Sequence, residues 1–258
     1  DLILAFAYMA YGERVFFPEI SYGFYPVFAG LFRSEMTEIP LDPELRVCPE
    51  DYYDARGTVI IANPNAPTGM ALSREEMRGI LQRNGNNVVI VDEAYVDFGG
   101  ESCVPLIEDY ENLLVVQTFS KSRSLAGMRI GVALGQRELI DDLNRIKYSF
   151  NPYNLSREAI VAAKASMEDV EYFRETVRRI VATREMFSGE MEKLGCRVLP
   201  SSANFVFVKK GKAYFEALRE RGILIRYFDR DPIRDYVRIT IGTEEEMREL
   251  LKVTEEIL

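Results

Sequence analysis

One lysine stands among hydroxyl side chains just after a strongly apolar segment. Residues 112–117 read Asn-Leu-Leu-Val-Val-Gln, which predicts a buried strand, and the segment Thr118-Phe-Ser-Lys121 follows it. A lysine placed at the end of a buried strand would lose hydration, which disfavours its ammonium form and lowers its pKa. Such an amine can attack a carbonyl group. Taken alone, a Ser-Lys pair after a strand more often marks an ordinary solvated loop.

Three neighbours of this lysine offer groups that bind an anion. Arg129 lies eight residues further on, and its planar guanidinium suits the oxygens of a phosphate. Thr118 and Ser120 add hydroxyl donors, so a phosphate is the most plausible ligand. The alternative for Thr118 is a simple β-forming residue at the end of a strand.

The composition excludes several classes of function. The chain of 258 residues contains no histidine, which rules out Ser-His-Asp and Cys-His catalysis and any histidine-ligated metal site. Its formal net charge is −9 and no basic tract stands out, so nucleic acid is not an expected partner. The three cysteines are scattered without metal spacing, which favours a reduced, cytosolic protein without a metal. No apolar run reaches membrane-spanning length.

Strand and helix signals alternate in the first part of the chain. Buried strands are predicted at residues 15–17, 58–62, 87–91, 112–117 and 128–134, and a helix at 22–32. Ser73 and Glu76 form a capping box that opens another helix. Continuous β-branched runs separated by helices indicate a mostly parallel sheet that is covered on both faces.

Polar segments follow three of these strands. They are residues 63–69, 92–95 and 118–121. Ligands of parallel sheets bind at the carboxyl ends of the strands, so these segments should converge on one edge.

The second part of the chain changes character. Helices are predicted at residues 141–148, 156–194 with a break near 166–168, and 212–221. Strands are predicted at 197–199, 205–208, 223–227 and 236–241, and Thr243 with Glu246 opens a final helix. We therefore expect an α/β chain with a large domain at residues 1–148 and a smaller α+β domain at residues 149–258.

Four motifs resemble, in order and spacing, those of the pyridoxal-phosphate-dependent aminotransferases of the aspartate aminotransferase fold, also called fold type I. They are Asn63-Pro-Asn-Ala-Pro-Thr-Gly69, Asp92-Glu-Ala-Tyr95, Thr118-Phe-Ser-Lys121 and Ala126-Gly-Met-Arg129. The lysine segment is similar to the class II signature. Within that family the chain resembles the histidinol-phosphate aminotransferases most, through Tyr22-Gly-Phe-Tyr25 and Arg238-Ile-Thr-Ile-Gly242. The resemblance runs from residue 1 to residue 258.

The resemblance implies a catalytic role for three residues. Lys121 would hold the cofactor through its amine and then move a proton at the substrate Cα. Asp92 would pair with the protonated ring nitrogen of pyridoxal phosphate, and Tyr95 would bind its phenolic oxygen. The structural alternatives are a surface lysine, an aspartate that caps a helix and a tyrosine of the core.

The same resemblance implies a binding role for further residues. Tyr22 would stack on the cofactor ring, and Thr118, Ser120 and Arg129 would hold its phosphate. Arg238 and Arg226, inside apolar strand runs, would bind the anionic groups of the substrate. Ordinary exposed strand positions are the alternative for both arginines. Asn204 is a further candidate for the substrate site.

Two departures from the family pattern stand out. An asparagine that contacts the cofactor ring oxygen precedes Pro-Thr-Gly in most relatives, whereas this chain has Ala66 there. Either Asn65 takes its place by a shift of the loop, or that hydrogen bond is missing. The family's amino-terminal arm and its glycine-rich phosphate loop would lie upstream of Asp1, so we expect the intact protein to be longer.

The expected function is that of a histidinol-phosphate:2-oxoglutarate aminotransferase of histidine biosynthesis. Its substrates would be a phosphorylated amino compound and a 2-oxo acid, and the enzyme would be a cytoplasmic homodimer. A threonine-phosphate decarboxylase and an aromatic aminotransferase of the same fold are the near alternatives. A non-catalytic effector domain of a transcription regulator is the distant one.

Overall fold

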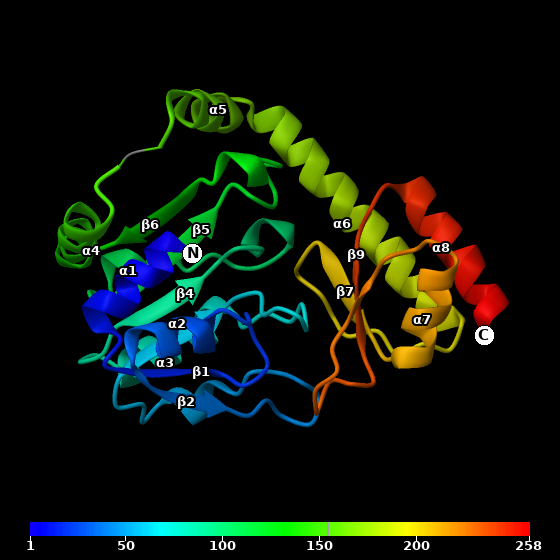
Figure 1. The fold of residues 1–258 in the computed structure, drawn as a ribbon, viewed down its shortest axis with the longest axis horizontal. Coiled ribbons are helices and arrows are strands. Elements are labelled where there is room, and N and C mark those ends of the chain that lie inside the picture. The colour runs from blue at the N-terminus through cyan, green and yellow to red at the C-terminus, as the bar shows by residue number, and fades with distance from the viewer. Residues whose placement is uncertain (154) are drawn as a thin grey trace.

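The apolar runs of the first part form a six-stranded sheet in the computed structural model, which describes residues 1–153 and 155–258 (Figure 1). Its strands, in spatial order, are β2 (Glu35–Ile39), β1 (Arg14–Pro18), β3 (Thr58–Ala62), β4 (Val89–Asp92), β5 (Leu113–Thr118) and β6 (Gly131–Gly135). The first five run parallel, and β6 is antiparallel to β5. All five residues of β3 are buried, as a strand covered on both faces requires. The expected mostly parallel α/β fold is thus confirmed.

Helices cover this sheet on both faces. One face packs against α1 (Leu2–Tyr11), α2 (Tyr25–Phe32) and α4 (Arg137–Phe150). The other face packs against α3 (Arg74–Arg83) and the short helices η1 (Pro49–Tyr52) and η3 (Val104–Glu108). Along β3, Ile60 points to the first core, while Val59 and Ile61 point to the second.

The last part of the chain builds a second, smaller sheet. Its strands pair antiparallel in the order β7 (Phe205–Val208), β9 (Val237–Thr240) and β8 (Arg226–Tyr227). The helices around it are α6 (Val170–Lys193), α7 (Lys212–Glu220) and α8 (Glu244–Ile257), and α5 (Arg157–Glu168) precedes them. Val206 and Ile239 face those helices in a separate core, whereas the opposite face of the sheet carries Phe205 and Phe207. Figure 1 shows α6 running along the flank of this sheet.

A third apolar contact joins the two sheets. Ile20 and Leu45 from the first part pack with Leu199, Phe207 and Tyr236 from the second. The rings of Phe207 and Tyr236 are stacked with their centroids 4.9 Å apart. This buried contact holds the small sheet against the end of the large one.

Several predicted boundaries were wrong, each for a local reason. The helix predicted at 22–32 begins only at Tyr25, because residues 22–24 form a turn. The apolar segment at 128–134 becomes a strand only at Gly131, since the short helix η4 (Ala126–Met128) comes first. Of the predicted strand 197–199, only an isolated bridge from Val198 to Val208 forms. The strand predicted at 223–227 shrinks to two residues.

One strand escaped prediction altogether. β2 is the edge strand, and only Ile39 of its five residues is buried. Such a strand lacks the alternation of polar and apolar residues that a half-buried strand shows.

The helix starts that rest on capping boxes were predicted correctly, whereas the helix predicted from residue 141 begins at Arg137. Both capping boxes form, with Ser73 accepting from the Glu76 amide and Thr243 from the Glu246 amide. The break near 166–168 falls at Asp169, whose carboxylate accepts a hydrogen bond from the amide of Tyr172 and caps α6. Among the helices in the described part of the chain, none combines the length and apolar character that a membrane crossing needs.

Candidate active site

The three polar segments converge as their strand order predicts. β3, β4 and β5 are neighbours, and Asp92 lies opposite Ala62 on one side and Val116 on the other. Since all three strands run parallel, the segments that follow them leave the sheet at the same edge. The small sheet lies beyond that edge (Figure 1).

Asp92 ends the central strand in a setting with little water. Its Oδ2 accepts a hydrogen bond from the Tyr25 hydroxyl at 3.0 Å, and its Oδ1 accepts one from the Ala94 amide at 3.1 Å. Loss of hydration is the largest influence on this carboxyl and raises its pKa, although the two donors and the charge of Lys121 oppose that shift. Among the described residues Asp92 forms no ion pair, and Lys121 and the amino terminus act on it only through their charge, so the carboxylate can stabilise a bound cationic group.

The next residue, Glu93, has a different environment. Its carboxylate is buried and accepts from the Ser102 hydroxyl at 2.8 Å, the Cys103 amide at 2.5 Å and the Gln117 side chain at 2.7 Å. Burial raises its pKa too, but three protein donors already occupy it. Glu93 therefore fastens the loop at residues 102–103 to β5 and uses most of its acceptor capacity within the protein.

Tyr25 is a site residue that the sequence analysis did not identify. It lies fully buried at the start of α2, and its ring packs edge-on against Tyr22 at 5.6 Å. Burial and the neighbouring Asp92 raise the pKa of its hydroxyl, so it stays protonated and donates to the carboxylate. The motif Tyr22-Gly-Phe-Tyr25 was noticed as a cue, but only contact with Asp92 reveals what its last residue does.

Lys121 lies at the site but is not buried. Its side chain is exposed, so the expectation of a desolvated amine is wrong. β5 ends at Thr118, and the three residues that follow carry the lysine beyond the covered part of the sheet. The amine lies 5.3 Å from the centre of the Tyr95 ring, a cation–π distance. Lys121 and Tyr95 thus meet although 26 residues separate them.

The predicted anion-binding residues lie together near the start of α1. Thr118 donates to the Ser120 hydroxyl at 2.9 Å. Arg129 is exposed, with its Nη2 3.5 Å from a carboxylate oxygen of Asp1, and the Tyr22 hydroxyl donates to that carboxylate at 2.9 Å. Arg129 and Tyr22 thus already hold one anionic group, and its position beside the amino end of a helix suits an anion.

Asn65 is committed to its own loop. Its side-chain amide donates to the Ile20 carbonyl at 2.9 Å and to the Thr68 hydroxyl at 3.2 Å, and its oxygen accepts from Ser21 at 2.8 Å. Both amide hydrogens are therefore used, and the expectation that Asn65 replaces the missing asparagine at position 66 is not supported.

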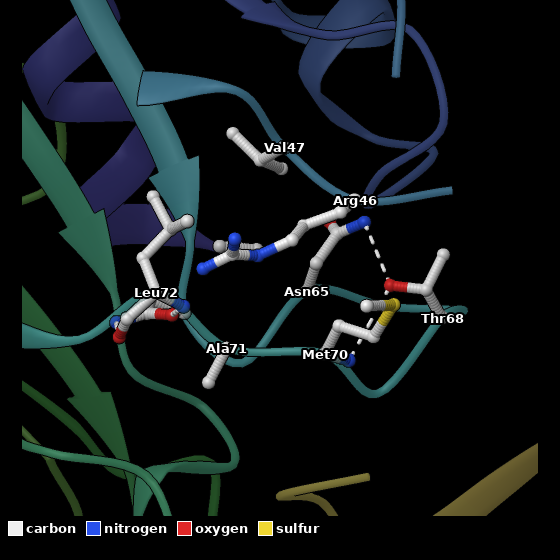
Figure 2. Close-up of a pocket in the computed structure, with 9 residues that line it drawn as sticks. Arg46, Val47, Asn65, Thr68, Met70, Ala71 and Leu72 are labelled. Carbon is white, nitrogen blue, oxygen red and sulfur yellow. Dashed lines mark hydrogen bonds between the residues drawn. The ribbon is translucent and has the colours of Figure 1, made fainter. Parts of the chain in front are cut away.

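The cavity beside this loop is too small for a cofactor. It is lined by Asn65, Thr68 and Arg46 among others, as Figure 2 shows. Its volume is about 10 Å³, which is room for one water molecule at most. The candidate cofactor site is instead the open edge of the sheet at Asp92 and Lys121.

Two arginines face this edge from the small sheet. Arg226 and Arg238 lie directly opposite each other on β8 and β9, so their side chains leave the same face. The guanidinium of Arg238 lies 5.1 Å from the centre of the Phe205 ring, and that ring meets Tyr95 edge-on at 5.1 Å. Phe205 therefore links Arg238 to the Tyr95–Lys121 pair.

Arg238 also has an unsatisfied donor. Its Nε is buried and has no hydrogen-bond partner in the described structure. A buried guanidinium N–H without an acceptor is costly, so the arginine is ready to receive an anion. Arg226 is more exposed and lies 5.5 Å from the Phe228 ring.

Asn204 stands next to this group without a demonstrated contact to it. Its backbone carbonyl accepts from the Ile241 amide at 2.9 Å, which ties β7 to the end of β9. Its place directly before Phe205 brings it to the site, and its role towards a substrate remains a prediction.

The fold and these motifs together define a class of protein, the fold-type I pyridoxal-phosphate enzymes. The family model "Aminotransferase class I and II" matches residues 1–253. The chain therefore belongs to the class I and II aminotransferase family and is a pyridoxal-phosphate-dependent aminotransferase.

Individual relatives share most of the chain. It is 48% identical over 265 residues to a histidinol-phosphate aminotransferase of Clostridium botulinum (strain 657 / Type Ba4), covering 100% of this chain and 75% of the relative. A histidinol-phosphate aminotransferase of Clostridium beijerinckii is 48% identical over 98% of this chain and 72% of its own length. Among solved structures, the histidinol-phosphate aminotransferase from Clostridium acetobutylicum superposes with a TM-score of 0.90 at 26% identity, over 100% of this chain and 82% of that one.

The environment of Asp92 makes a prediction about stability and pH in the cofactor-free protein. Burial raises its pKa above the ordinary value of 3.8, so the folded state holds a proton that the unfolded chain has released. Stability contributed by Asp92 therefore falls as the pH rises through the interval between the two pKa values. Asp92→Asn removes this loss, and its melting temperature relative to wild type should rise as the pH increases above about 4.

Thermal unfolding of both proteins across that range checks this expectation. Asp109→Asn, at an exposed aspartate, is the control and should show no such trend. A difference between Asp92→Asn and wild type that does not change with pH would contradict it.

Proposed function

We propose that this protein is a histidinol-phosphate aminotransferase, which exchanges an amino group between histidinol phosphate and 2-oxoglutarate in histidine biosynthesis. The observation that carries the proposal is the pair Arg226 and Arg238, which lie opposite each other beside the edge that holds Lys121. Histidinol phosphate carries a phosphate, and glutamate, which forms from 2-oxoglutarate, carries two carboxylates. Both compounds therefore need cationic groups at the site. Relatives that bear this name at 47–48% identity support the same substrate.

The residues present fit the cofactor. A carboxylate with neutral donors and no ion pair suits a protonated ring nitrogen, and Asp92 provides it. When bound, pyridoxal phosphate supplies an electron sink for charge that develops at the substrate Cα. Tyr25 holds the Asp92 carboxylate in place, and Tyr95 binds the phenolic oxygen of the cofactor.

The remaining cofactor contacts come from the edge near α1. Tyr22 covers the face of the ring, while Thr118, Ser120 and Arg129 bind the phosphate. The carboxylate of Asp1 lies between Arg129 and Tyr22, which shows that an anionic group fits at this position.

Lys121 carries the proton at the reacting carbon. Its amine would hold the cofactor and, when free, would take the proton from the substrate Cα and deliver it to the cofactor, as amino-group transfer requires. The Lys121 amine lies against Tyr95 and is otherwise exposed. It can therefore move towards the cofactor ring without losing a buried contact. General acid–base transfer of this kind typically contributes about 10²–10⁴-fold to the rate.

Arg238 and Arg226 bind the anionic ends of the substrate. Arg238 lies closer to the Tyr95–Phe205 pair, so it binds the group nearer to Cα, and its buried Nε gains an acceptor when that group arrives. Arg226 binds the more distant group from the exposed side of the small sheet. Asn204 adds an amide beside Phe205.

We further propose that the chain works as two domains, residues 1–148 and 149–258, in the cytoplasm. The separate cores of the large and small sheets support this division. All three cysteines are free, which fits a reducing compartment.

A homodimer is also part of the proposal, because an apolar stripe next to the site faces outward. Phe24, Val27 and Leu31 lie along one side of α2 with 48%, 53% and 68% of their area exposed. Contiguous exposed apolar residues of this kind often mark an interface. α2 begins three residues after Tyr22, so a second copy seated there would adjoin the cofactor edge.

Turnover is the direct test of the substrate. The purified holoenzyme should produce glutamate from 2-oxoglutarate and histidinol phosphate, and Lys121→Ala should lower kcat by roughly 10²–10⁴-fold or more. Release of carbon dioxide from threonine phosphate, or a preference for phenylalanine, would replace the proposal with one of its near rivals. Bound cofactor without turnover of any of these substrates would favour an effector domain.

Arg238→Ala tests the substrate clamp. Loss of a charged hydrogen bond of about 1.5–3 kcal/mol should raise the KM by roughly 10–100-fold while the protein retains its cofactor. Arg221→Ala, which removes an exposed arginine that binds only its own helix, is the matched control and should leave KM unchanged. Equal losses of substrate affinity and cofactor affinity would argue against this role.

The dimer prediction concerns Leu31. Leu31→Asp places a charge in the apolar stripe and should convert the dimer to a monomer, because a desolvated, unpaired carboxylate is costly in an interface. Analytical ultracentrifugation measures the change. Leu224→Asp alters an equally apolar exposed residue on the other part of the chain and should leave the mass unchanged. A Leu31→Asp protein that keeps the mass of wild type would place the interface elsewhere.

A further inference from the structure

An arginine is buried where the two parts of the chain meet. Arg184 lies on α6 with only 5% of its area exposed. It shares the inward side of the helix with Ile180, Phe187 and Met191, at the spacing of an amphipathic helix. A guanidinium in such a position is tolerated only when its donors are occupied.

Its donors reach both parts of the chain. Nη1 donates to the Phe98 carbonyl at 2.8 Å and to the Ala203 carbonyl at 2.8 Å. Nε and Nη2 donate to one carboxylate oxygen of Glu185, at 3.0 Å and 2.7 Å, which balances the charge. A single nitrogen thus joins the short helix η2 (Val96–Phe98), after β4, to the loop that leads into β7.

A second backbone contact supports the same junction. The Ser202 amide donates to the Gly69 carbonyl at 2.8 Å. Gly69 has a φ of +82°, and a Cβ there would lie 2.6 Å from the Ser201 hydroxyl, so only glycine allows the two loops to come this close. The loop at residues 201–204 is therefore fixed through Ser202 and Ala203 to the segments that follow β3 and β4.

The residues on either side of these carbonyls belong to the active site. Tyr95 precedes Phe98 by three residues, and Phe205 follows Ala203 by two. Their rings meet edge-on at 5.1 Å, with Lys121 over the one ring and Arg238 over the other. The distance between Lys121 and Arg238 therefore depends on how the loops that carry Tyr95 and Phe205 lie against each other. Arg184 binds both of these loops.

We propose that Arg184 is a positioning residue that sets the distance between the substrate clamp Arg238 and the amine of Lys121. The inference rests on the clamp role assigned to Arg238 above. A planar guanidinium can bridge two carbonyls and a carboxylate at once, whereas a lysine amine cannot keep all of these contacts in one geometry. Misplacement of a substrate by about 1 Å can cost around 10²-fold in rate.

The test is a double-mutant cycle with the holoenzyme. Arg184→Met should lower kcat/KM by roughly 10²-fold without loss of cofactor, and Arg184→Lys should lower it less. In a background of Arg238→Ala the effect of Arg184→Met should largely disappear, because there is no clamp left to misplace. Arg178→Met, on the exposed side of the same helix and paired only with Glu175, is the control and should have no effect.

The outcomes separate positioning from simple destabilisation. The proposal would be overturned if Arg184→Met and Arg238→Ala lowered kcat/KM by independent factors. An unchanged kcat/KM in a folded Arg184→Met protein would overturn it as well. Should Arg184→Met fail to fold, Arg184→Lys enters the same cycle, with melting temperatures recorded for every variant. The rate measured in the cycle is that of the single-turnover formation of 2-oxoglutarate from glutamate. The test of Arg184 therefore remains valid even when histidinol phosphate proves not to be the substrate.

Discussion

The carboxylate of Asp92, largely removed from water at the end of the central strand, is the constraint on which this structure depends. Three parallel strands of almost wholly apolar residues bring it to the edge of the sheet, where it forms no ion pair within the described residues and feels Lys121 only through its charge. Tyr25 and the Ala94 amide give it hydrogen bonds without charge. In the role proposed for Asp92, a bound protonated ring nitrogen would meet this electrostatic need, and the buried Tyr25 hydroxyl from α2 would hold the carboxylate for it.

The large sheet could be predicted because its strands are buried on both faces. Residues 59–62 and 113–116 are continuous apolar runs, and a parallel order then places the polar segments that follow them together without further information. The edge strand β2 could not be predicted in this way, and the strand predicted at 223–227 pairs only over the two residues of β8, since neither has a run of buried side chains. Their position depends on pairing with a neighbour rather than on their own pattern.

The site was predicted in outline but not in its supports. Motif spacing placed Asp92, Tyr95 and Lys121 correctly at one edge, yet the burial expected for Lys121 was wrong because the strand ends three residues before it. The contacts of Tyr25 and Asn65 depend on loops that meet only in three dimensions. Arg184 did leave a signal, namely an arginine at an apolar position of an amphipathic helix, but its partners at residues 98 and 203 lie far away in the sequence.

The arginine pair shows how the small sheet depends on what binds to the large one. Like charges directly opposite each other on neighbouring strands destabilise a sheet, and Arg226 and Arg238 are such a pair. The face that carries them also carries Phe205 and Phe207, so neither arginine gains a carboxylate from within the small sheet. In the clamp role proposed for these arginines, an anionic substrate would relieve both the repulsion and the unpaired Nε of Arg238. Because the relief comes only when the anion lies between the two sheets, substrate binding and the packing of the small sheet on the large one must favour each other.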